Sequence, residues 1–114
     1  MNEPIKEYDE KGNLIHYKSP YGYEWWKEYD ERGNETHFKD SNGFKYWTEY
    51  DESGTQTHYK SSYGYEFWTE YDKDGKDKCS LVINSIGEIS TENENLFSDK
   101  LKRKYNLLLL RRKK

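Results

Sequence analysis

The chain has 114 residues and a formal net charge of −3, with 36% charged and 32% hydrophobic residues. This length suits one small domain and is too short for the two-domain crevice of many cofactor enzymes. Between His16 and Ser80 there is no Ala, Val, Ile, Leu or Met, which excludes a Rossmann domain, a TIM barrel or a helical bundle there. Aromatic residues make up 18% of the chain, so any core in that stretch must be built from rings.

A repeat of 21 residues organises most of the sequence, with copies that begin at Glu7, Glu28 and Glu49 and a decaying fourth copy at Glu70. The second and third copies are identical at 12 of 21 positions. Each copy contains two glycines. Asp30-Glu31-Arg32-Gly33 predicts a three-residue hairpin loop with a bulge, and Asn42-Gly43 predicts a two-residue type I′ loop. Each repeat therefore predicts one β-hairpin.

The predicted fold is mainly β: an antiparallel meander of about seven strands, largely single-layer, with a C-terminal α-helix. The predicted strands are residues 13–20, 23–30, 34–41, 44–51, 55–62, 65–72 and 76–83. We expect one structural domain, in which residues 1–89 form the sheet and residues 90–114 form a helix and basic tail packed on it. Ser90-Thr91-Glu92 predicts the start of the helix, and its apolar stripe is Phe97, Leu101, Tyr105 and Leu108.

The two predicted loop types set a cross-strand register and hence two faces. One face carries an unbroken row of rings, Tyr17, Trp26, Phe38, Trp47, Tyr59 and Trp68, beside Glu28, Glu49 and Glu70. The other carries Trp25, Tyr46 and Phe67 beside lysines. We expect Leu81 and Ile83 to project toward the second face, so that the helix covers it and the acidic aromatic face stays open.

Two copies of a shorter motif, Tyr29-Asp30 with Gly33-Asn34 and Tyr50-Asp51 with Gly54, resemble the YD repeat of Rhs and teneurin proteins. The resemblance covers about residues 7–75. It implies a hairpin scaffold, because the repeats of that family are structural or binding elements without chemistry of their own.

The residues that could carry chemistry recur with the repeat. His16, His37, His58 and Cys79 share one repeat position and have the composition of a zinc site. Successive members lie two strands apart, about 9.6 Å, whereas the ligands of one ion must converge. We expect no metal and no cofactor, and a row of solvated or ring-stacked histidines. Repeated carboxylates share one environment, unlike a catalytic pair, so we expect no enzyme activity.

Charge is distributed unevenly along the chain. Residues 1–99 carry 22 acidic and 11 basic side chains, and residues 100–114 carry 8 basic and no acidic ones. An acidic body attracts basic partners and repels nucleic acid. The N-terminus has no signal pattern, Leu107 to Leu110 is too short to span a bilayer, and Cys79 is the single cysteine. These features predict a cytoplasmic protein without a membrane partner.

A ring-rich face bordered by acids suits a basic protein surface. We expect a non-catalytic inhibitor that covers the nucleic-acid-binding surface of a bacterial nuclease or defence effector, similar to anti-CRISPR and immunity proteins. The predicted partner-binding residues are Trp26, Trp47, Trp68, Phe38, Tyr59, Glu28, Glu49 and Glu70. Arg103, Lys104, Arg111 and Arg112 are predicted to contact RNA or DNA held by that partner. Two alternatives remain: a carbohydrate-binding module that uses the aromatic row, and a structural fragment that forms a homodimer.

Overall fold

The computed structural model describes residues 3–112, with side chains as far as Arg111. This part of the chain contains nine antiparallel strands, one 3-10 helix and one α-helix. The β-meander and the C-terminal helix are confirmed, but the predicted number of seven strands is wrong. The chain divides between Tyr63 and Gly64 into two compact units, each of which has its own architecture.

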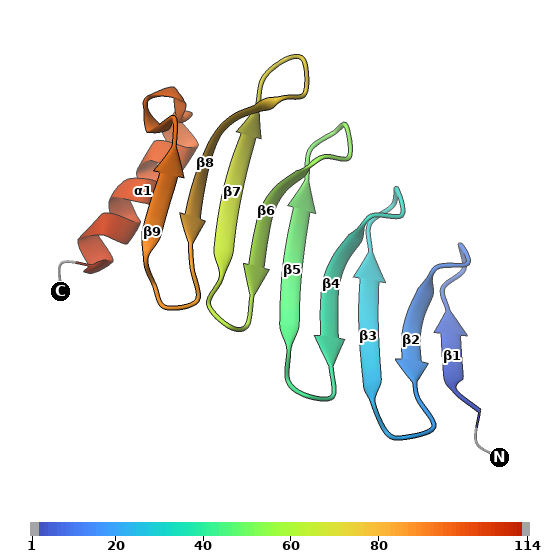
Figure 1. The fold of residues 1–114 in the computed structure, drawn as a ribbon. Helices are drawn as coiled ribbons and strands as arrows, with labels where there is room; N and C mark the ends of the chain where they lie inside the picture. Colours follow the sequence, from blue (N-terminus) through green and yellow to red (C-terminus); the bar gives the residue numbers. More distant parts are fainter. Residues whose placement is uncertain (1–2, 113–114) are drawn as a thin grey trace. The chain divides into compact units, whose positions relative to one another are not determined.

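The first unit is a six-stranded antiparallel sheet in chain order (Figure 1). Its strands are β1 (Ile5–Tyr8), β2 (Leu14–Lys18), β3 (Glu24–Tyr29), β4 (Glu35–Asp40), β5 (Lys45–Tyr50) and β6 (Gln56–Ser61). Sequence analysis missed β1, because Ile5 stands where the later repeats have a tryptophan. Residues 3–63 contain no helix and no second sheet, so this unit is a single layer.

One loop design closes all seven hairpins that lie within a unit. An Asp, Ser or Asn accepts backbone N–H groups from the residues two and four positions later, and a glycine with positive φ stands three positions later. Asp40 Oδ1 accepts from Asn42 at 2.9 Å and from Phe44 at 3.1 Å. Gly43 has φ +88°, whereas Asn42 is not in the left-handed region. The predicted three-residue loop at Gly33 is confirmed, and the predicted type I′ loop at Asn42-Gly43 is wrong.

The longer loop changes which residues pair across the strands. Phe38 pairs with Tyr46 rather than with Trp47. Between β3 and β4, a bulge at Glu28 and Tyr29 also shifts the register. Phe38 therefore pairs with Lys27 rather than with Trp26. A slip of one residue moves every side chain of a strand to the other face. The predicted row of six rings is therefore wrong, because within the first unit its members on β2, β4 and β6 lie on the opposite face from those on β3 and β5.

A different row of rings runs across β2 to β6. Its members are Tyr17, Trp25, Phe38, Tyr46 and Tyr59, with successive ring centroids 5.8, 6.2, 5.1 and 5.5 Å apart. We call this side of the first unit the aromatic-ladder face. Each pair of rings contributes about 0.5–1 kcal/mol beyond its burial. The hydroxyl of Tyr50 on the same unit donates to the Glu35 carbonyl at 2.7 Å and so ties β5 to β4.

The second unit contains three strands, a 3-10 helix and an α-helix: β7 (Glu66–Tyr71), β8 (Asp77–Ile83), β9 (Ile89–Glu92), η1 (Glu94–Leu96) and α1 (Asp99–Arg112). The predicted helix start at Ser90 is wrong, since residues 89–92 pair with β8 as a strand. The α-helix begins nine residues later, at Asp99.

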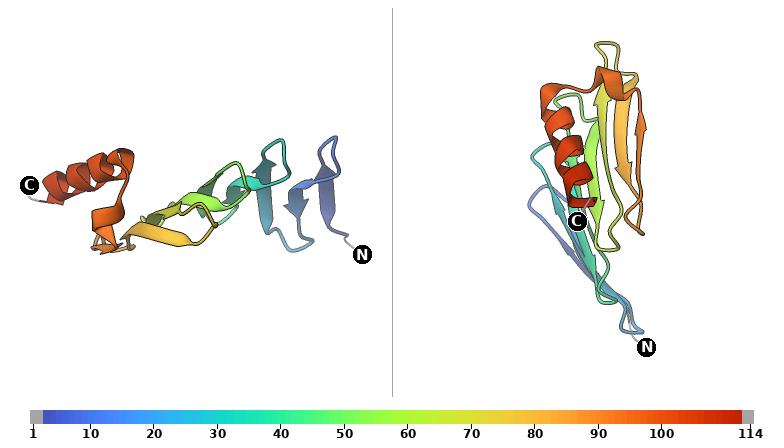
Figure 2. Two further views of the ribbon diagram at one scale, coloured as in Figure 1. Left: turned by 90° about the horizontal axis from the view of Figure 1, so that it is seen from above. Right: turned by 90° about the vertical axis from the view of Figure 1, so that its left-hand side faces the viewer.

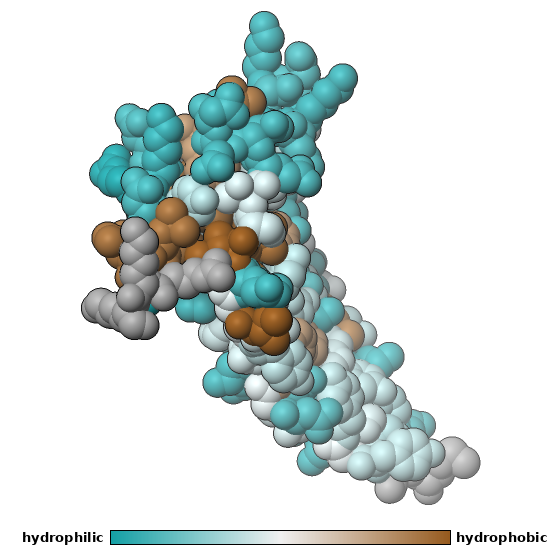
Figure 3. Space-filling model, turned by 60° about the vertical axis from the view of Figure 1, so that its left-hand side comes forward, coloured by the Kyte–Doolittle hydropathy of each residue, from teal (hydrophilic) through white to brown (hydrophobic). Residues whose placement is uncertain are grey.

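An aliphatic and aromatic core holds α1 against the strands of the second unit (Figure 2). Cys79, Leu81, Phe97 and Leu101 are buried, and Trp68, Ile89, Tyr105 and Leu108 pack around them. The predicted apolar stripe is thus confirmed. The prediction that the helix covers the face that carries Phe67 is wrong. Leu81 pairs with Trp68, and both side chains lie beneath the helix. In Figure 3 the strongly apolar residues gather over this unit.

Gly43→Ala should destabilise the chain by about 1–2 kcal/mol, because a residue with a Cβ adopts the left-handed backbone conformation of this position only at a free-energy cost. The space around the added Cβ is open, so no steric clash adds to that cost. Gly43→Asn should cost less, since asparagine tolerates this conformation. Urea unfolding monitored by tryptophan fluorescence measures both. Equal losses from the two variants would contradict the positive φ.

Leu101→Ala should destabilise the second unit by about 2–5 kcal/mol, because this side chain is only 3% exposed in the core. Leu107→Ala is the matched control on the same helix; Leu107 is 53% exposed, and its loss should change stability by no more than about 0.5 kcal/mol. Thermal unfolding followed by circular dichroism compares them. Similar effects from both would show that α1 does not pack as described.

Candidate functional site

The side of the first unit opposite the aromatic ladder carries rows of four different side chains. One row is Glu7, His16, Trp26 and Lys39, paired across β1 to β4. The next row is Glu28, His37, Trp47 and Lys60, paired across β3 to β6. A third row begins with Glu49 and His58. We call the surface formed by these residues the Glu–His–Trp face.

Each histidine of this face is paired with a glutamate on the preceding strand. His37 Nδ1 lies 3.1 Å from Glu28 Oε2, and His58 Nδ1 lies 2.5 Å from Glu49 Oε1. His16 contacts two carboxylates, Glu7 through Nδ1 and Glu24 through Nε2, the latter at 2.5 Å. The hydrogen bonds that the His16 ring donates, first to Glu24 and then to Glu7, raise the pKa of His16 above its ordinary value. Each repeat therefore contributes one glutamate–histidine pair, whose two members lie on adjacent strands.

Ring contacts connect each histidine to the following tryptophan. The ring centroids of His16 and Trp26 are 5.3 Å apart with planes 8° from parallel, and those of His37 and Trp47 are 5.2 Å apart. On Trp26, Lys39 Nζ lies 4.9 Å from the ring centroid. An open depression lined by residues that include Glu7 and Trp26 lies along this row.

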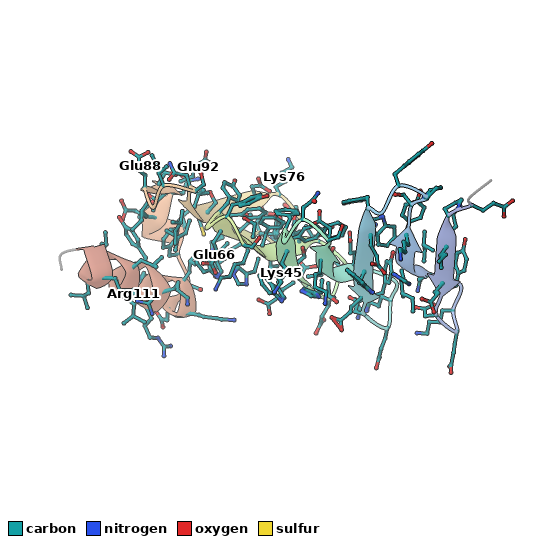
Figure 4. All side chains as sticks on the ribbon, turned by 90° about the horizontal axis from the view of Figure 1, so that it is seen from below. Lys45, Glu66, Lys76, Glu88, Glu92 and Arg111 are labelled. Atoms are coloured by element: carbon teal, nitrogen blue, oxygen red, sulfur yellow. The ribbon has the colours of Figure 1, made fainter. Side chains whose placement is uncertain are left out.

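The Glu–His–Trp face is accessible within its own unit. Side chains stand on both sides of the strands, as Figure 4 shows, and Lys45 on β5 is among those labelled. Trp47 is 42% exposed, and the side chains of Glu28 and Glu49 are 72% and 71% exposed. Between residues 3 and 63 the sequence has 13 acidic and 8 basic side chains. The first unit is therefore acidic as a whole, and this face of it carries an exposed ring.

The structure brings together four of the eight residues predicted to bind a partner: Trp26, Trp47, Glu28 and Glu49 share the Glu–His–Trp face. Phe38 and Tyr59 lie on the aromatic-ladder face of the same unit. Trp68 and Glu70 belong to the second unit, and Trp68 packs against the core beneath α1.

Glu70 has a structural partner in the second unit. Its carboxylate accepts from the backbone N–H of Ser98 at 2.9 Å, from the Ser98 hydroxyl, and from the Cys79 thiol at 3.3 Å. Burial alone would raise the pKa of Glu70, but the hydrogen bonds from Ser98 and Cys79 outweigh it and hold that pKa below its ordinary value. This glutamate therefore anchors the segment that leads into α1.

The predicted nucleic-acid contacts lie on α1. Arg103 and Arg111 are exposed, and Lys104 Nζ lies 5.5 Å from the centroid of the Trp68 ring. Lys104 is thus engaged within its own unit. The side chain of Arg112 lies outside the described part of the chain.

The row of His16, His37, His58 and Cys79 does not converge. Within residues 3–112, no group of three or more His, Cys, Asp or Glu side chains is arranged to hold a metal ion. Burial first, and then the hydrogen bond to Glu70, raise the pKa of the Cys79 thiol to about 11. This thiol is therefore protonated and unreactive near neutral pH.

The chain matches no known protein family model, and no curated protein is significantly similar to it. The resemblance to YD repeats accordingly stays a prediction. Among residues 3–112, no helix has the length and apolar character needed to cross a membrane.

Sequence analysis missed the glutamate–histidine pairs, although the signal was present. In each repeat a glutamate stands nine residues before the histidine, as in Glu28 and His37, and the observed hairpin pairs these positions through its loop and the bulge beside Glu28. The cation above Trp26 was missed because Lys39 was assigned to the other face.

The stability of the first unit should fall as pH rises above the ordinary histidine pKa of 6.5. The folded-state pKa of His16 is raised, so its stabilising contribution is complete below the unfolded pKa and is lost as pH rises through the folded one. NMR titration should place the midpoint of His16 above that ordinary value, and Glu24→Gln should lower it. A midpoint that does not respond to this substitution would contradict the pairing.

Proposed function

We propose that this chain is a non-catalytic binding protein whose Glu–His–Trp face docks on a basic protein surface. The partner is the nucleic-acid-binding channel of a bacterial nuclease or defence effector, which the docked chain blocks. The observation that carries the proposal is the exposed Trp47 ring on the same face as the exposed carboxylates of Glu28 and Glu49. Large rings supply binding energy, and surrounding charges set the rate and specificity of association.

Charge favours a protein partner over nucleic acid itself. The first unit has five more acidic than basic side chains, which opposes the approach of phosphates. A basic channel that normally receives nucleic acid has the complementary sign. Occupation of that channel needs no reaction, since a bound chain excludes the substrate by volume and charge.

The test is competition. The purified chain is added to a panel of bacterial nucleases, and both the binding of a labelled oligonucleotide and its cleavage are measured at low and at physiological salt. We expect loss of binding and of cleavage together for the enzyme that is the target. Retention of oligonucleotide by every nuclease, combined with binding to a glycan panel or a dimeric mass in sedimentation, would replace the proposal with one of the two alternatives.

Glu49→Lys should slow association with the target about tenfold and leave dissociation nearly unchanged, because exposed charges act mainly on encounter. The thermal transition should move little, since the Glu49 side chain is 71% exposed. Asp74→Lys is the matched control, with the same change of net charge in an exposed loop of the second unit. Equal slowing by both variants would show that net charge, and not this face, governs docking.

A further inference from the structure

Helix α1 presents a stripe of exposed side chains on a side that does not pack on the core. Lys100, Arg103, Leu107 and Leu110 stand three or four residues apart, so they share one side of the helix. Arg111, four residues after Leu107, borders the same side. All five side chains are exposed. We call this surface the basic leucine stripe.

The two leucines of the stripe have no place in the core of the second unit. Leu107 is 53% exposed and Leu110 is 60% exposed, whereas Leu101 on the core side of the same helix is 3% exposed. A single exposed leucine needs no explanation. Two of them, one helical turn apart and bordered by cations, form an apolar strip that no element of the second unit covers.

Positive charge surrounds these leucines. Residues 100–114 contain eight basic and no acidic side chains, and Asp99 at the first position is the single acidic residue of α1. Among the described side chains, no lysine or arginine between residues 100 and 111 forms an ion pair. In Figure 4 the labelled Glu88 and Glu92 lie on the far side of the strands from the helix that carries Arg111. The stripe is therefore a cationic surface without a compensating acid beside its leucines.

We infer that the basic leucine stripe docks on the surface of an anionic phospholipid bilayer. The leucines enter the boundary between headgroups and acyl chains, and the lysines and arginines contact the headgroup phosphates. The core side of α1 stays on the strands, so docking requires no unfolding. This inference does not rest on the proposed function, which uses the first unit.

Sequence analysis expected no membrane partner because the run from Leu107 to Leu110 is too short to span a bilayer. A helix that lies in the interface needs no such length, because only one of its sides enters the lipid. A group of four to eight lysines and arginines on such a helix is typical of binding to anionic lipids. The exposure of both leucines is what the sequence alone does not reveal.

A lipid surface fits the stripe better than the nucleic acid that sequence analysis predicted for this helix. Both offer phosphates to the basic side chains. The backbone of nucleic acid gives Leu107 and Leu110 no apolar environment, whereas the acyl chains of a bilayer do. Lys104 is in addition engaged over the Trp68 ring, at 5.5 Å from its centroid.

The experiment is co-sedimentation of the full chain with vesicles of phosphatidylcholine alone and with vesicles that also contain phosphatidylserine. We expect binding to the vesicles with phosphatidylserine only, and weaker binding as the salt concentration rises. A labelled oligonucleotide of mixed sequence, titrated with the chain in the same buffers, tests nucleic acid as the alternative occupant.

A first pair of variants tests the leucines. Leu107→Ser combined with Leu110→Ser should weaken binding to the anionic vesicles about tenfold or more, because two apolar side chains no longer enter the lipid. Ile86→Ser combined with Leu96→Ser is the matched control, since it removes two exposed apolar side chains of the same unit outside the stripe. This control should bind as the unchanged chain does. Circular dichroism verifies that both variants are folded.

A second pair of variants tests the charges. Lys100→Gln combined with Arg103→Gln should weaken binding to the anionic vesicles about tenfold and reduce its dependence on salt. Lys73→Gln combined with Lys76→Gln makes the same change of net charge in the exposed loop between β7 and β8. That control should change binding little, because these lysines lie outside the stripe.

Three results would overturn the inference. One is equal binding to both kinds of vesicle, and another is binding that depends on the cations of the stripe but not on its leucines. The third is tight binding of the oligonucleotide without binding to the anionic vesicles, which would return nucleic acid as the partner of α1. None of these results bears on the nuclease competition, because that test concerns the Glu–His–Trp face.

Discussion

The side chain that closes each hairpin loop is the interaction on which the rest of the structure depends. Asp30, like its counterparts in the other loops, accepts two backbone N–H groups and so fixes a three-residue loop that ends in a glycine. Loop length sets the cross-strand register, and register decides which side chains share a face. The aromatic ladder and the Glu–His–Trp rows are both consequences of this local contact, repeated along the chain.

The two units solve the problem of burial differently because their compositions differ. The first unit has no aliphatic residue after Ile15, and its strands are held by ring pairs and tyrosine hydroxyls in a single layer. Aliphatic residues return with Leu81, and there a helix covers the strands and buries a small core. A ladder of half-exposed rings stabilises a sheet without a covering layer. Both faces of the first unit therefore stay uncovered by other elements of that unit.

Sequence alone predicted the repeat, the meander, the bulged loop at Gly33 and the apolar stripe of the helix. It predicted the grouping of Trp47 with Glu49 correctly because residues two apart on one strand share a face in any register. The placement of Phe38 with Trp47 failed because it relied on a register that an error of one residue in loop length reverses. The missed signal was the Asp, Ser or Asn three residues before every glycine, as in Asp40 and Gly43, which indicates one loop type throughout.

A repeat makes copies alike, and function depends on where the copies differ. Identical environments cannot supply the two unlike groups of an acid–base pair, whereas they can add their contributions in binding. The neighbours of each copy then break the equivalence. A lysine lies over Trp26, the core beneath α1 takes up Trp68, and Trp47 alone among the three stays exposed. The middle copy is therefore the one that exposes its tryptophan ring to solvent, although nothing in its own sequence distinguishes it from the other copies.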